Sequence, residues 1–495
     1  MKKFAILLFI TLLPISAAAA EDSGMKLSLK EAVKLAIEGN LDLRAELYTP
    51  AQAESDLRKS RSIYEPHLTL DTSYEEATQF TPSLGGGTYQ STFALTPGAN
   101  QLLPSGGTLA LKYQNQKQNG TIIVPPFESS WSSSLGLSLS QPLLKNFGRE
   151  TTELNIRVSQ LSKDTSISHL RSRILAIVAQ VRTEYFNLVS FREDFEARKS
   201  SLDLARKVLS ETEARVNAGV LPAMEILNAR FGVSSREKEL IDSERALHDQ
   251  VDLLSGLLQL RKVDNILTTD KPETSSIEIN ESDALKKALT FRPELEELKG
   301  QLAIADIQTS VAQKQILPSL NLLSSVALTG LGNGDGRDTE RLASANYPVW
   351  SVGLQLDYPI GNESARNDYI KSRLRGEQTA VQIESLKSSI EIEVKNAIRA
   401  VKSSYKQLDV AETARMYADE RVKAYMKKGE VGLATTKDIL DVENDLVAAK
   451  SNLIKANAGY ATALNQLWKS TGELLEREGI TVDASKSDAI YKEAR

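Results

Sequence analysis

The feature that most constrains the fold is an internal duplication. The segment EAVKLAIEGNLDLRAEL (31–47) aligns with DALKKALTFRPELEELK (283–299) at an offset of 252 residues, and the same offset matches Pro66 to Pro318 without a gap. A repeat of this length is far longer than the roughly 20–50 residues of a solenoid unit. The sequence therefore predicts two structurally equivalent halves.

The match continues along both copies with smaller offsets. LGLSLSQP (135–142) aligns with VGLQLDYP (352–359) at an offset of 217, and GVLPAMEILN (219–228) aligns with GLATTKDILD (432–441) at an offset of 213. The fall from 252 to 217 places 35 extra residues in the first copy, between its two matched prolines. We expect this excess to be loop growth.

Long helices are predicted in both copies. Apolar residues recur every three or four positions along 170–195 and again along 383–408, which is the spacing of helices that pack along one face. No proline interrupts 151–220 or 361–441. These stretches predict helices of about 65–70 residues, on the order of 100 Å long.

Around the matched prolines the apolar period becomes two, which is the pattern of a strand with two different faces. The segments are 68–74, 135–139, 320–322 and 352–358. Each copy is therefore predicted to run helix, strand, loop, strand, long helix, turn and helix. Alternation alone leaves open a second interpretation, in which the strands are surface hairpins of a soluble helical protein.

The amino terminus predicts export. Lys2 and Lys3 precede an apolar run from Phe4 to Ile15, and alanines follow before Glu21, which is the pattern of a cleaved secretory signal. The apolar run is shorter than the roughly 20 residues of a spanning helix, which argues against an uncleaved anchor. No later stretch could form a transmembrane helix, whereas the strands of a β-barrel need only about 10 alternating residues.

Composition excludes several function classes. The chain has no cysteine, so a disulfide, a thiolate metal site and a lipidated amino-terminal cysteine are excluded. His67, His169 and His248 have no ligand spacing, and we expect neither a metal nor a cofactor. A formal charge of −5 without a basic stripe argues against nucleic acid as a partner.

Taken in order, the motifs resemble the TolC-like outer membrane factor family. The resemblance extends from residue 27 to about residue 472. Its motifs are LSLKEAVKLAIEGNLDLRA (27–45), LSLSQPLL (137–144), NAGVLPAMEILNAR (217–230), LQLDYPIG (354–361) and KKGEVGLATTKDILDVEN (427–444).

The resemblance implies a mixed α and β membrane protein. Three chains would form a homotrimer and contribute four strands each to one 12-stranded outer-membrane β-barrel, which continues into a long periplasmic α-helical barrel. It implies a passive exit duct of a tripartite efflux or type I secretion system, and no enzyme. Its implied partners are a periplasmic adaptor protein, an inner-membrane transporter and outer-membrane lipid.

The expected organisation follows from this resemblance. We expect a signal peptide at 1–20, periplasmic helices at 21–65, barrel strands and outer loops at 66–142, the helical barrel at 143–315 with a hairpin turn near 217–223, barrel strands at 316–359, the helical barrel again at 360–472 with a turn near 429–436, and a C-terminal tail at 473–495.

The resemblance also implies a channel constriction at the second hairpin. The family's DxxD motif matches Asp438 and Asp441, and Glu225 takes the place of the acid in the first copy. Threefold symmetry would make rings of carboxylates, which favour cations. From spacing alone, the alternative is that these acids only complement the positive end of a helix, by about 0.3–1 kcal/mol each.

The two hairpin turns are the expected adaptor contacts, within 218–223 and 431–436. The residues concerned are Gly219, Val220 and Leu221 in the first copy and Gly432, Leu433 and Ala434 in the second.

The chain departs from the family at the latch between hairpins. Where the best-known members have an arginine and a tyrosine, this chain has Ala434 and Gly429. The latch must therefore differ, with Lys427, Lys428 and Lys437 as candidates for it, or it is looser than in those members.

The 35-residue excess is a second departure. FALTPGANQLLPSGGTLALKYQNQ (93–116) contains a PSGG turn followed by alternating apolar residues, which predicts an extra hairpin. We favour an elaboration of the outer face, with six strands per chain as the competing count.

The alternative function is a periplasmic coiled-coil scaffold or adaptor without a barrel. An exit duct is expected to fractionate with the outer membrane and to migrate in electrophoresis as a trimer until it is boiled. A scaffold would instead be recovered as a soluble periplasmic protein, and that result would exclude the duct.

Overall fold

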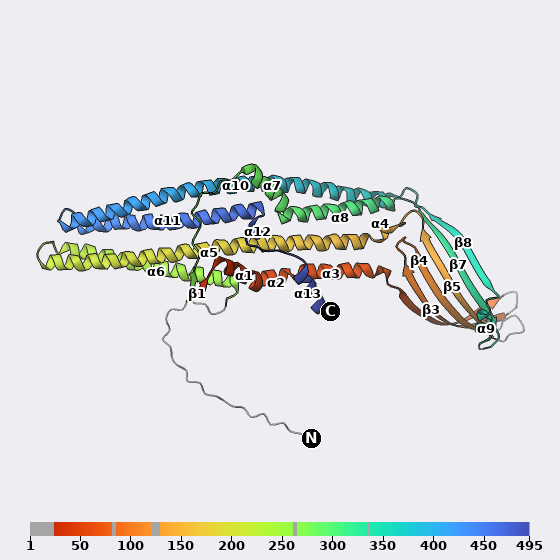
Figure 1. Ribbon diagram of the computed structural model, residues 1–495. Helices are drawn as coiled ribbons and strands as arrows, with labels where there is room; N and C mark the ends of the chain where they lie inside the picture. The colour runs from red at the N-terminus through yellow and green to blue at the C-terminus, as the bar shows by residue number, and fades with distance from the viewer. Residues whose placement is uncertain (1–23, 82–85, 121–128, 261–264, 335, 495) are drawn as a thin grey trace, which may run out of the picture. The chain divides into compact units, whose positions relative to one another are not determined.

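The computed structural model describes residues 24–81, 86–120, 129–260, 265–334 and 336–494 (Figure 1). The predicted signal peptide lies outside these residues. The chain divides into two compact units. Unit 1 takes its residues from Met1–Leu41, Ala176–Ile279 and Asn396–Lys469, and unit 2 from Asp42–Leu175, Asn280–Lys395 and Ser470–Arg495.

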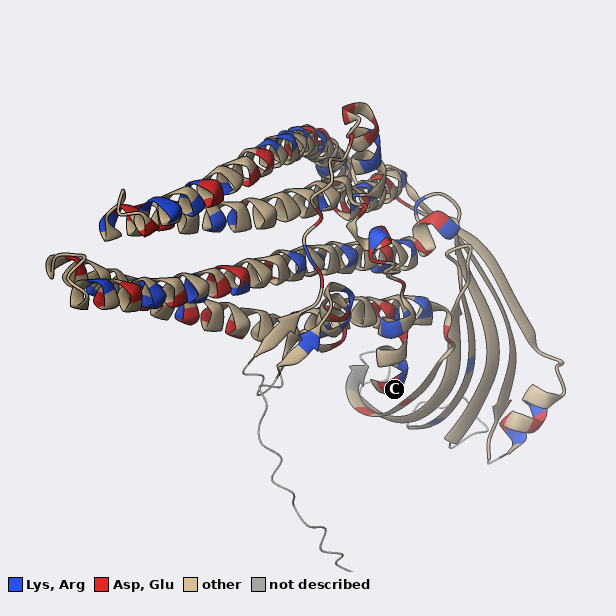
Figure 2. Ribbon diagram, turned by 60° about the vertical axis from the view of Figure 1, so that its left-hand side comes forward, with Lys and Arg blue, Asp and Glu red and all other residues tan. Residues whose placement is uncertain are grey.

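Unit 2 contains one antiparallel sheet of six strands in the order β2-β3-β4-β5-β7-β8. The strands are β2 (His67–Thr81), β3 (Gly86–Leu102), β4 (Thr108–Gly120), β5 (Ser129–Pro142), β7 (Ser319–Gly332) and β8 (Pro348–Asp357). Four of these strands join helical segments at one end of the sheet, which we call the near end, and the opposite end is the far end. Figure 2 shows that the strands curve and carry few charged residues, whereas the helices carry many.

Paired rows of residues cross the whole sheet and alternate in polarity. Successive residues of a strand point to opposite faces, so neighbouring rows belong to opposite faces. The apolar row consists of Leu68, Ala99, Leu111, Leu137, Val326 and Trp350. The next row consists of His67, Asn100, Ala110, Ser138, Ser325 and Ser351. The sheet therefore has one apolar face and one largely polar face, and Trp350 is 75% exposed on the apolar face.

The prediction of four strands per chain is wrong, and the competing count of six describes the sheet. The extra residues of the first copy form β3 and β4, which pair with β2 and β5 inside the sheet instead of elaborating its far end. A hairpin adds two strands, so it leaves the antiparallel alternation of the flanking strands unchanged.

The turn between β3 and β4, at 103–107, lies at the near end and is fixed to the segment that follows β5. The Gly148 N–H donates to the Ser105 carbonyl at 2.9 Å, and the Ser105 hydroxyl donates to Gln141 Oε1 at 2.6 Å. Gly106 has a φ of +87°, and a Cβ there would lie 2.3 Å from the Asn146 carbonyl oxygen. Only glycine fits this turn without a shift of the backbone.

The helices of unit 2 are mostly short. They are α2 (Leu41–Glu46), whose first residue belongs to unit 1, α3 (Tyr48–Arg61), the 3₁₀ turn η1 (Ser62–Tyr64), α4 (Arg149–Thr152), α7 (Glu281–Phe291), α8 (Pro293–Gln315), α9 (Arg337–Ala343), α12 (Leu474–Arg477) and α13 (Ser485–Ala494).

The expected C-terminal tail contains α12 and α13, and α13 packs on α3. Lys163 donates to both Glu54 and Asp488 at 2.9 Å. The Arg58 guanidinium lies 4.9 Å from the centre of the Tyr491 ring. These contacts hold the end of the chain against the helices of unit 2.

The two long helices have the predicted lengths. They are α5 (Leu154–Asn217), with 64 residues, and α10 (Glu363–Glu430), with 68 residues. Their last residues are 213 positions apart, which is the offset expected from the duplication. Each is followed by a shorter helix, α6 (Met224–Leu258) and α11 (Thr436–Thr471), to make two hairpins (Figure 1). Among the described helices, none combines the length and the apolar character needed to cross a membrane.

Unit 1 also contains α1 (Leu29–Gly39) and a small parallel sheet that was not expected. Its strands are β1 (Met25–Leu27) and β6 (Ile266–Thr268). The fully buried Tyr185 of α5 donates its hydroxyl to the Leu27 carbonyl at 2.9 Å and accepts from the Thr269 N–H at 3.2 Å. One side chain of a long helix thus fixes both short strands.

We expect Gly106→Ala to lower the heating temperature at which the folded protein loses its compact electrophoretic form, because the new Cβ meets the Asn146 carbonyl. Gly148→Ala is the matched control, since Gly148 has a similar φ of +88° but a Cβ there would meet no atom within 4 Å. Gly148 has a ψ of 167°, in a region that is essentially restricted to glycine, so the control reports backbone strain alone, about 1–3 kcal/mol. Equal effects of both substitutions would contradict the close approach.

Candidate functional site

The free ends of the two helical hairpins in unit 1 are the candidate site. Gly219 and Gly432 stand two residues after the last residues of α5 and α10, with φ of +74° and +76°. The next N–H groups fold back, from Val220 to the Arg215 carbonyl at 2.9 Å and from Leu433 to the Lys428 carbonyl at 2.8 Å. Both turns thus use a left-handed glycine to end a helix. The duplication has placed the same device twice.

Apolar side chains of both turns face solvent. Val220 is 70% exposed and Leu433 is 78% exposed, while Leu221 and Ala434 are half-buried. In this chain, the expected adaptor-contact residues therefore include exposed apolar side chains at the tip of each hairpin.

Asp438 caps the first turn of α11. Its carboxylate accepts from the Thr435 N–H at 2.9 Å and from the Thr435 hydroxyl at 2.7 Å, and its own N–H donates to that hydroxyl at 3.1 Å. The backbone N–H of Thr435, followed by its hydroxyl, lowers the pKa of Asp438 from its ordinary value. Asp438 therefore does act at the start of a helix, as the alternative interpretation of this acid expects.

The second expected constriction acid lies on the same helix face. Asp438, Asp441 and Asp445 are all exposed and follow one another by three and four positions, which aligns them along one side of α11. Asp445 forms an ion pair with Arg421 at 2.9 Å. Asp441 has no ion-pair partner among the described residues. The exposed side of α11 near the turn is consequently acidic.

Glu225 occupies the equivalent place at the start of α6. Its side chain is half-buried, and its Oε2 atom is buried without a hydrogen-bond partner among the described residues. In this part of the chain, no hydrogen bond or ion pair joins Glu225 to Asp438 or Asp441. One chain alone does not bring the three acids together.

A buried ion pair, which sequence reasoning missed, joins the two hairpins. Arg236 of α6 donates from Nη2 to Glu443 Oε2 of α11 at 2.6 Å, and both side chains are 4% exposed. The Ser201 hydroxyl of α5 donates to the other carboxylate oxygen of Glu443 at 2.6 Å. Three helices therefore meet at one carboxylate.

The helices approach closely beside this pair. A Cβ added to Gly232 would lie 2.9 Å from Leu440 Cδ1, and Arg236 also donates to the Leu440 carbonyl at 3.2 Å. Nearer the tips, Arg215 Nη1 of α5 donates to the Gly429 carbonyl of α10 at 2.8 Å. Within the described residues, arginines thus join the two hairpins of one chain. Of the lysines suggested for the latch, Lys428 lies 5.0 Å from the centre of the Tyr425 ring on its own helix, and the part of these lysines in a latch stays a prediction.

The ion pair had a signal in the sequence. Leu440, Glu443 and Val447 follow one another by three and four positions and are all buried, so Glu443 is a charged residue on the apolar face of its helix. Arg236 likewise lies four positions after the buried Gly232, on the buried side of α6. A charge on an apolar face predicts a buried partner, but it does not say which one.

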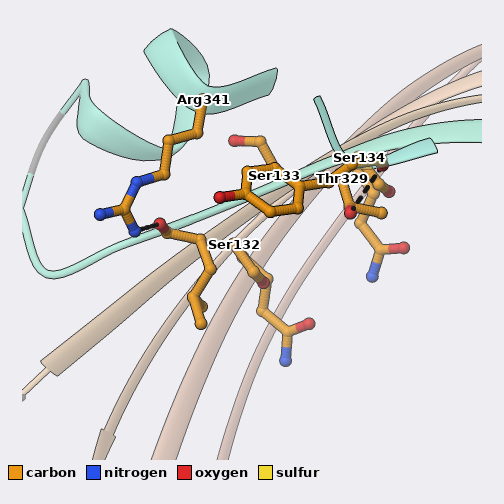
Figure 3. A pocket seen from close by; sticks show the side chains of 10 residues that line it. Ser132, Ser133, Ser134, Thr329 and Arg341 are labelled. Atoms are coloured by element: carbon orange, nitrogen blue, oxygen red, sulfur yellow. Dashed lines mark hydrogen bonds between the residues drawn. The ribbon is translucent and has the colours of Figure 1, made fainter. Parts of the chain in front are cut away.

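A pocket of about 510 Å³ lies near the far end of the sheet, beside α9 (Figure 3). Arg341 of α9 donates to the Leu331 carbonyl, and the buried Asp338 accepts from Ser133 and from Asn115. These bonds fix α9 to the strands. The lining residues are Gln114, Gln116, Ser132, Ser133, Ser134, Thr329, Gly330, Leu331, Arg341 and Tyr347.

The described residues contain no group of three or more histidine, aspartate or glutamate side chains placed to hold a metal ion. The site's chemistry in these residues is therefore that of carboxylates, arginines and exposed apolar tips.

Comparison with known proteins gives one family. Residues 32–258 and 284–473 each match the family described as "Outer membrane efflux protein". The two matches begin 252 residues apart, which is the offset of the duplication.

Two curated relatives cover the chain in part. The chain is 24% identical to the pyoverdine export outer membrane protein OpmQ of Pseudomonas aeruginosa over 317 residues, 61% of this chain and 64% of the relative. It is 24% identical to the outer membrane protein TolC of Escherichia coli over 331 residues, 63% of this chain and 65% of the relative. The matched region thus spans just under two-thirds of each relative.

The fold is also that of solved channels. The CmeC outer membrane channel of Campylobacter jejuni superposes with a TM-score of 0.63 at 18% identity, covering 94% of this chain and 89% of that one. At this identity the likeness establishes the fold alone.

We expect Arg236→Met to destabilise unit 1 by about 3–5 kcal/mol, because it leaves the Glu443 carboxylate buried without its partner. The readout is the midpoint of helix unfolding in detergent, followed by circular dichroism. Arg230→Met is the matched control on the same helix, since the Arg230 and Glu213 pair is exposed and worth about 0–1 kcal/mol. The double variant Arg236→Met, Glu443→Leu should recover most of the loss. A small effect equal to that of the control would contradict the role of the pair.

Proposed function

The chain belongs to the outer membrane efflux protein family, and from that membership we propose that it is a passive exit duct of the outer membrane. In this proposal several copies close their sheets into a barrel in lipid, and the helical hairpins extend through the periplasm toward an inner-membrane transporter. The chain moves its cargo without chemistry of its own, and the transporter supplies the energy.

The observation that carries the proposal is the six-strand row of apolar residues beside a polar row. A sheet with one apolar face suits a barrel whose outside contacts lipid and whose inside contacts water. As far as the structure describes the chain, the sheet ends in two free edges, β2 and β8. Lipid offers no hydrogen bonds to an open edge, so a sheet in the membrane must close. One chain does not close its sheet, which favours closure by further copies.

An exposed apolar stripe on α10 supports the same assembly. Its residues are separated by 4, 7, 11, 18 and 7 positions, each close to a whole number of 3.6-residue turns, so they share one helix face. Such a face is expected to pack against another helix. The residues are Ile370, Leu374, Val381, Ile392, Val410 and Tyr417. We propose that neighbouring copies cover this stripe in a homotrimer.

The proposed partners contact the hairpin tips. A periplasmic adaptor would bury the exposed apolar side chains of Val220 and Leu433, together with the neighbouring residues of 218–223 and 431–436. The family description concerns efflux and one relative is named for pyoverdine export, and we propose export of a small molecule for this chain too.

The proposed constriction consists of Asp438 and Asp441, with Glu225 nearby in the first copy. In a trimer, each aspartate would form a ring of three carboxylates. Two unit charges 4 Å apart repel by about 1 kcal/mol even in bulk water, and by more where water is confined. The rings would therefore attract cations and repel anions.

The alternative of a periplasmic scaffold without a barrel has no observation in its favour, because it leaves the apolar row facing water. The test is reconstitution of the purified protein in planar bilayers together with its native mass. A trimer that conducts ions is expected. A protein that is monomeric in detergent and silent in bilayers would overturn the duct.

We expect the double variant Asp438→Ala, Asp441→Ala to lose most of its preference for cations, measured as the reversal potential in a salt gradient. Asp249→Ala, Asp252→Ala is the matched control, because it removes a second exposed DxxD from α6, far along the helix from the turn. Selectivity that stays at the wild-type value in the first variant would refute the assignment.

Lowering the pH should also test the role of the Asp438 carboxylate, because protonation removes its charge. The hydrogen bonds from Thr435 favour the charged carboxylate, so the folded pKa of Asp438 lies below its unfolded value. The capping bonds are therefore fully present above the unfolded value, and they are lost only as pH falls through the lower folded value. Cation preference should accordingly decline only as pH falls through the folded pKa of Asp438, and the hydrogen bonds from Thr435 place this decline at a lower pH than it would have without them. Thr435→Ala should shift this decline to higher pH, and an unchanged profile would contradict the assigned cause.

A further inference from the structure

The extra hairpin of the first copy, β3 and β4, changes the number of strands that each chain can contribute to a barrel. β3 and β4 stand between β2 and β5 in the sheet. Without them, β2 and β5 could pair directly as antiparallel neighbours, and each chain would contribute four strands. The hairpin is therefore an insertion that widens the sheet without altering its remaining order.

The inserted strands belong to the wall of the sheet along their length. β3 pairs with β2 from His67↔Asn100 to Thr81↔Gly86, which is the whole of β2. β4 pairs with β5 from Thr108↔Ser140 to Asn119↔Ser129. The hairpin also continues both rows, with Ala99 and Leu111 in the apolar row and Asn100 and Ala110 in the polar row. Strands that extend the lipid-facing row are suited to line a pore, whereas an overhanging loop would not need this pattern.

In the part of the chain that the structure describes, the hairpin brings no helix with it. Four strands of the sheet join helical segments at the near end: β2 follows α3 and η1, β5 precedes α4, β7 follows α8 and β8 precedes α10. β3 and β4 instead join each other through the turn at 103–107, which is fixed to 141–148. Within the described residues, the chain therefore supplies six strands but only four connections to helices at the near end of the sheet.

From this mismatch we propose that three copies form an 18-stranded barrel whose lumen is wider than four strands per copy would give. The proposal rests on the proposed function. Each interface would pair β8 of one copy with β2 of the next, and because six is an even number, these two edges run antiparallel. Barrel diameter grows roughly linearly with strand number, so 18 strands give about 1.5 times the diameter of 12.

The wider lumen would act as a water-filled vestibule for bulky polar solutes. Barrels of about 16–18 strands leave an open aqueous channel. The lumen face carries hydroxyl and amide groups such as Asn100, Ser138 and Ser325, with Ser325 and Ser351 in contact at 2.8 Å. The size limit on cargo would then be set by the helical part of the duct, and the membrane pore would add no further limit.

Labelling of cysteines at two neighbouring positions of β4 tests whether this strand is part of the barrel wall. The chain has no cysteine, so Ala110→Cys and Leu111→Cys each give the full-length trimer a single thiol per copy. These positions lie on opposite faces of β4. We expect a charged maleimide to label the Ala110→Cys variant through the lumen and to lose access to the Leu111→Cys variant in lipid. Labelling of both positions would overturn the proposal, because it would place β4 outside the wall.

Deletion of 86–120 tests the width. It removes β3 and β4, and residues 82–85 and 121–128 then connect β2 to β5. Polymers of graded size, added at the outer side of the bilayer, should enter the wild-type barrel up to a diameter about 1.5 times the limit of the deletion variant. The strand count from electron cryo-microscopy of the wild-type trimer is the independent measurement if the variant does not assemble, with 18 strands expected.

The outcomes separate this proposal from the proposed function. A wild-type protein that conducts as a trimer with 12 strands in its wall, or with the same polymer limit as the deletion variant, overturns the wide barrel alone. A wild-type protein that neither assembles nor conducts overturns the duct, and the wide barrel with it.

Discussion

The backbone hydrogen-bonding groups at the two free edges of the six-stranded sheet are the constraint on which the proposed assembly depends. Among the described strands, β2 and β8 each have one side without a partner strand. In water such an edge can be solvated, but in lipid each unpaired group costs several kcal/mol. The apolar row from Leu68 to Trp350 commits one face of this sheet to an apolar environment. In the proposed outer-membrane setting, the sheet and its edges would therefore require closure by other copies.

The helices meet a different requirement. Their apolar faces must pack against other helices in an aqueous surrounding. Polar contacts within this apolar packing add specificity to how the helices align. The Arg236 and Glu443 pair is buried, so it is no simple source of stability, but it permits few alternative alignments of α6 against α11. The close approach at Gly232 acts in the same direction. The two hairpins of a chain are thereby held in one register, and the exposed, acidic side of α11 stays outside this contact.

Much of the fold was predictable because it depends on local periodicity. The duplication, the lengths of α5 and α10 and the alternation of β7 and β8 follow from spacing that one strand or one helix imposes on its own residues. The resemblance placed the turns at Gly219 and Gly432 and named the acids at 438 and 441. The partner of each buried charge was not predictable, since 207 positions separate Arg236 from Glu443 and no local rule relates them.

What the sequence by itself determined is the set of elements and the polarity of their faces, because hydrophobic period and proline position act over a few residues. The tertiary structure alone decided where those elements pair. It placed the inserted hairpin inside the sheet instead of at its far end, attached β1 and β6 to Tyr185, and set α9 over Asn115 and Ser133. The physical reason is that strand pairing and buried ion pairs join residues far apart in the chain, so their energies depend on the whole arrangement and leave only weak traces in local sequence.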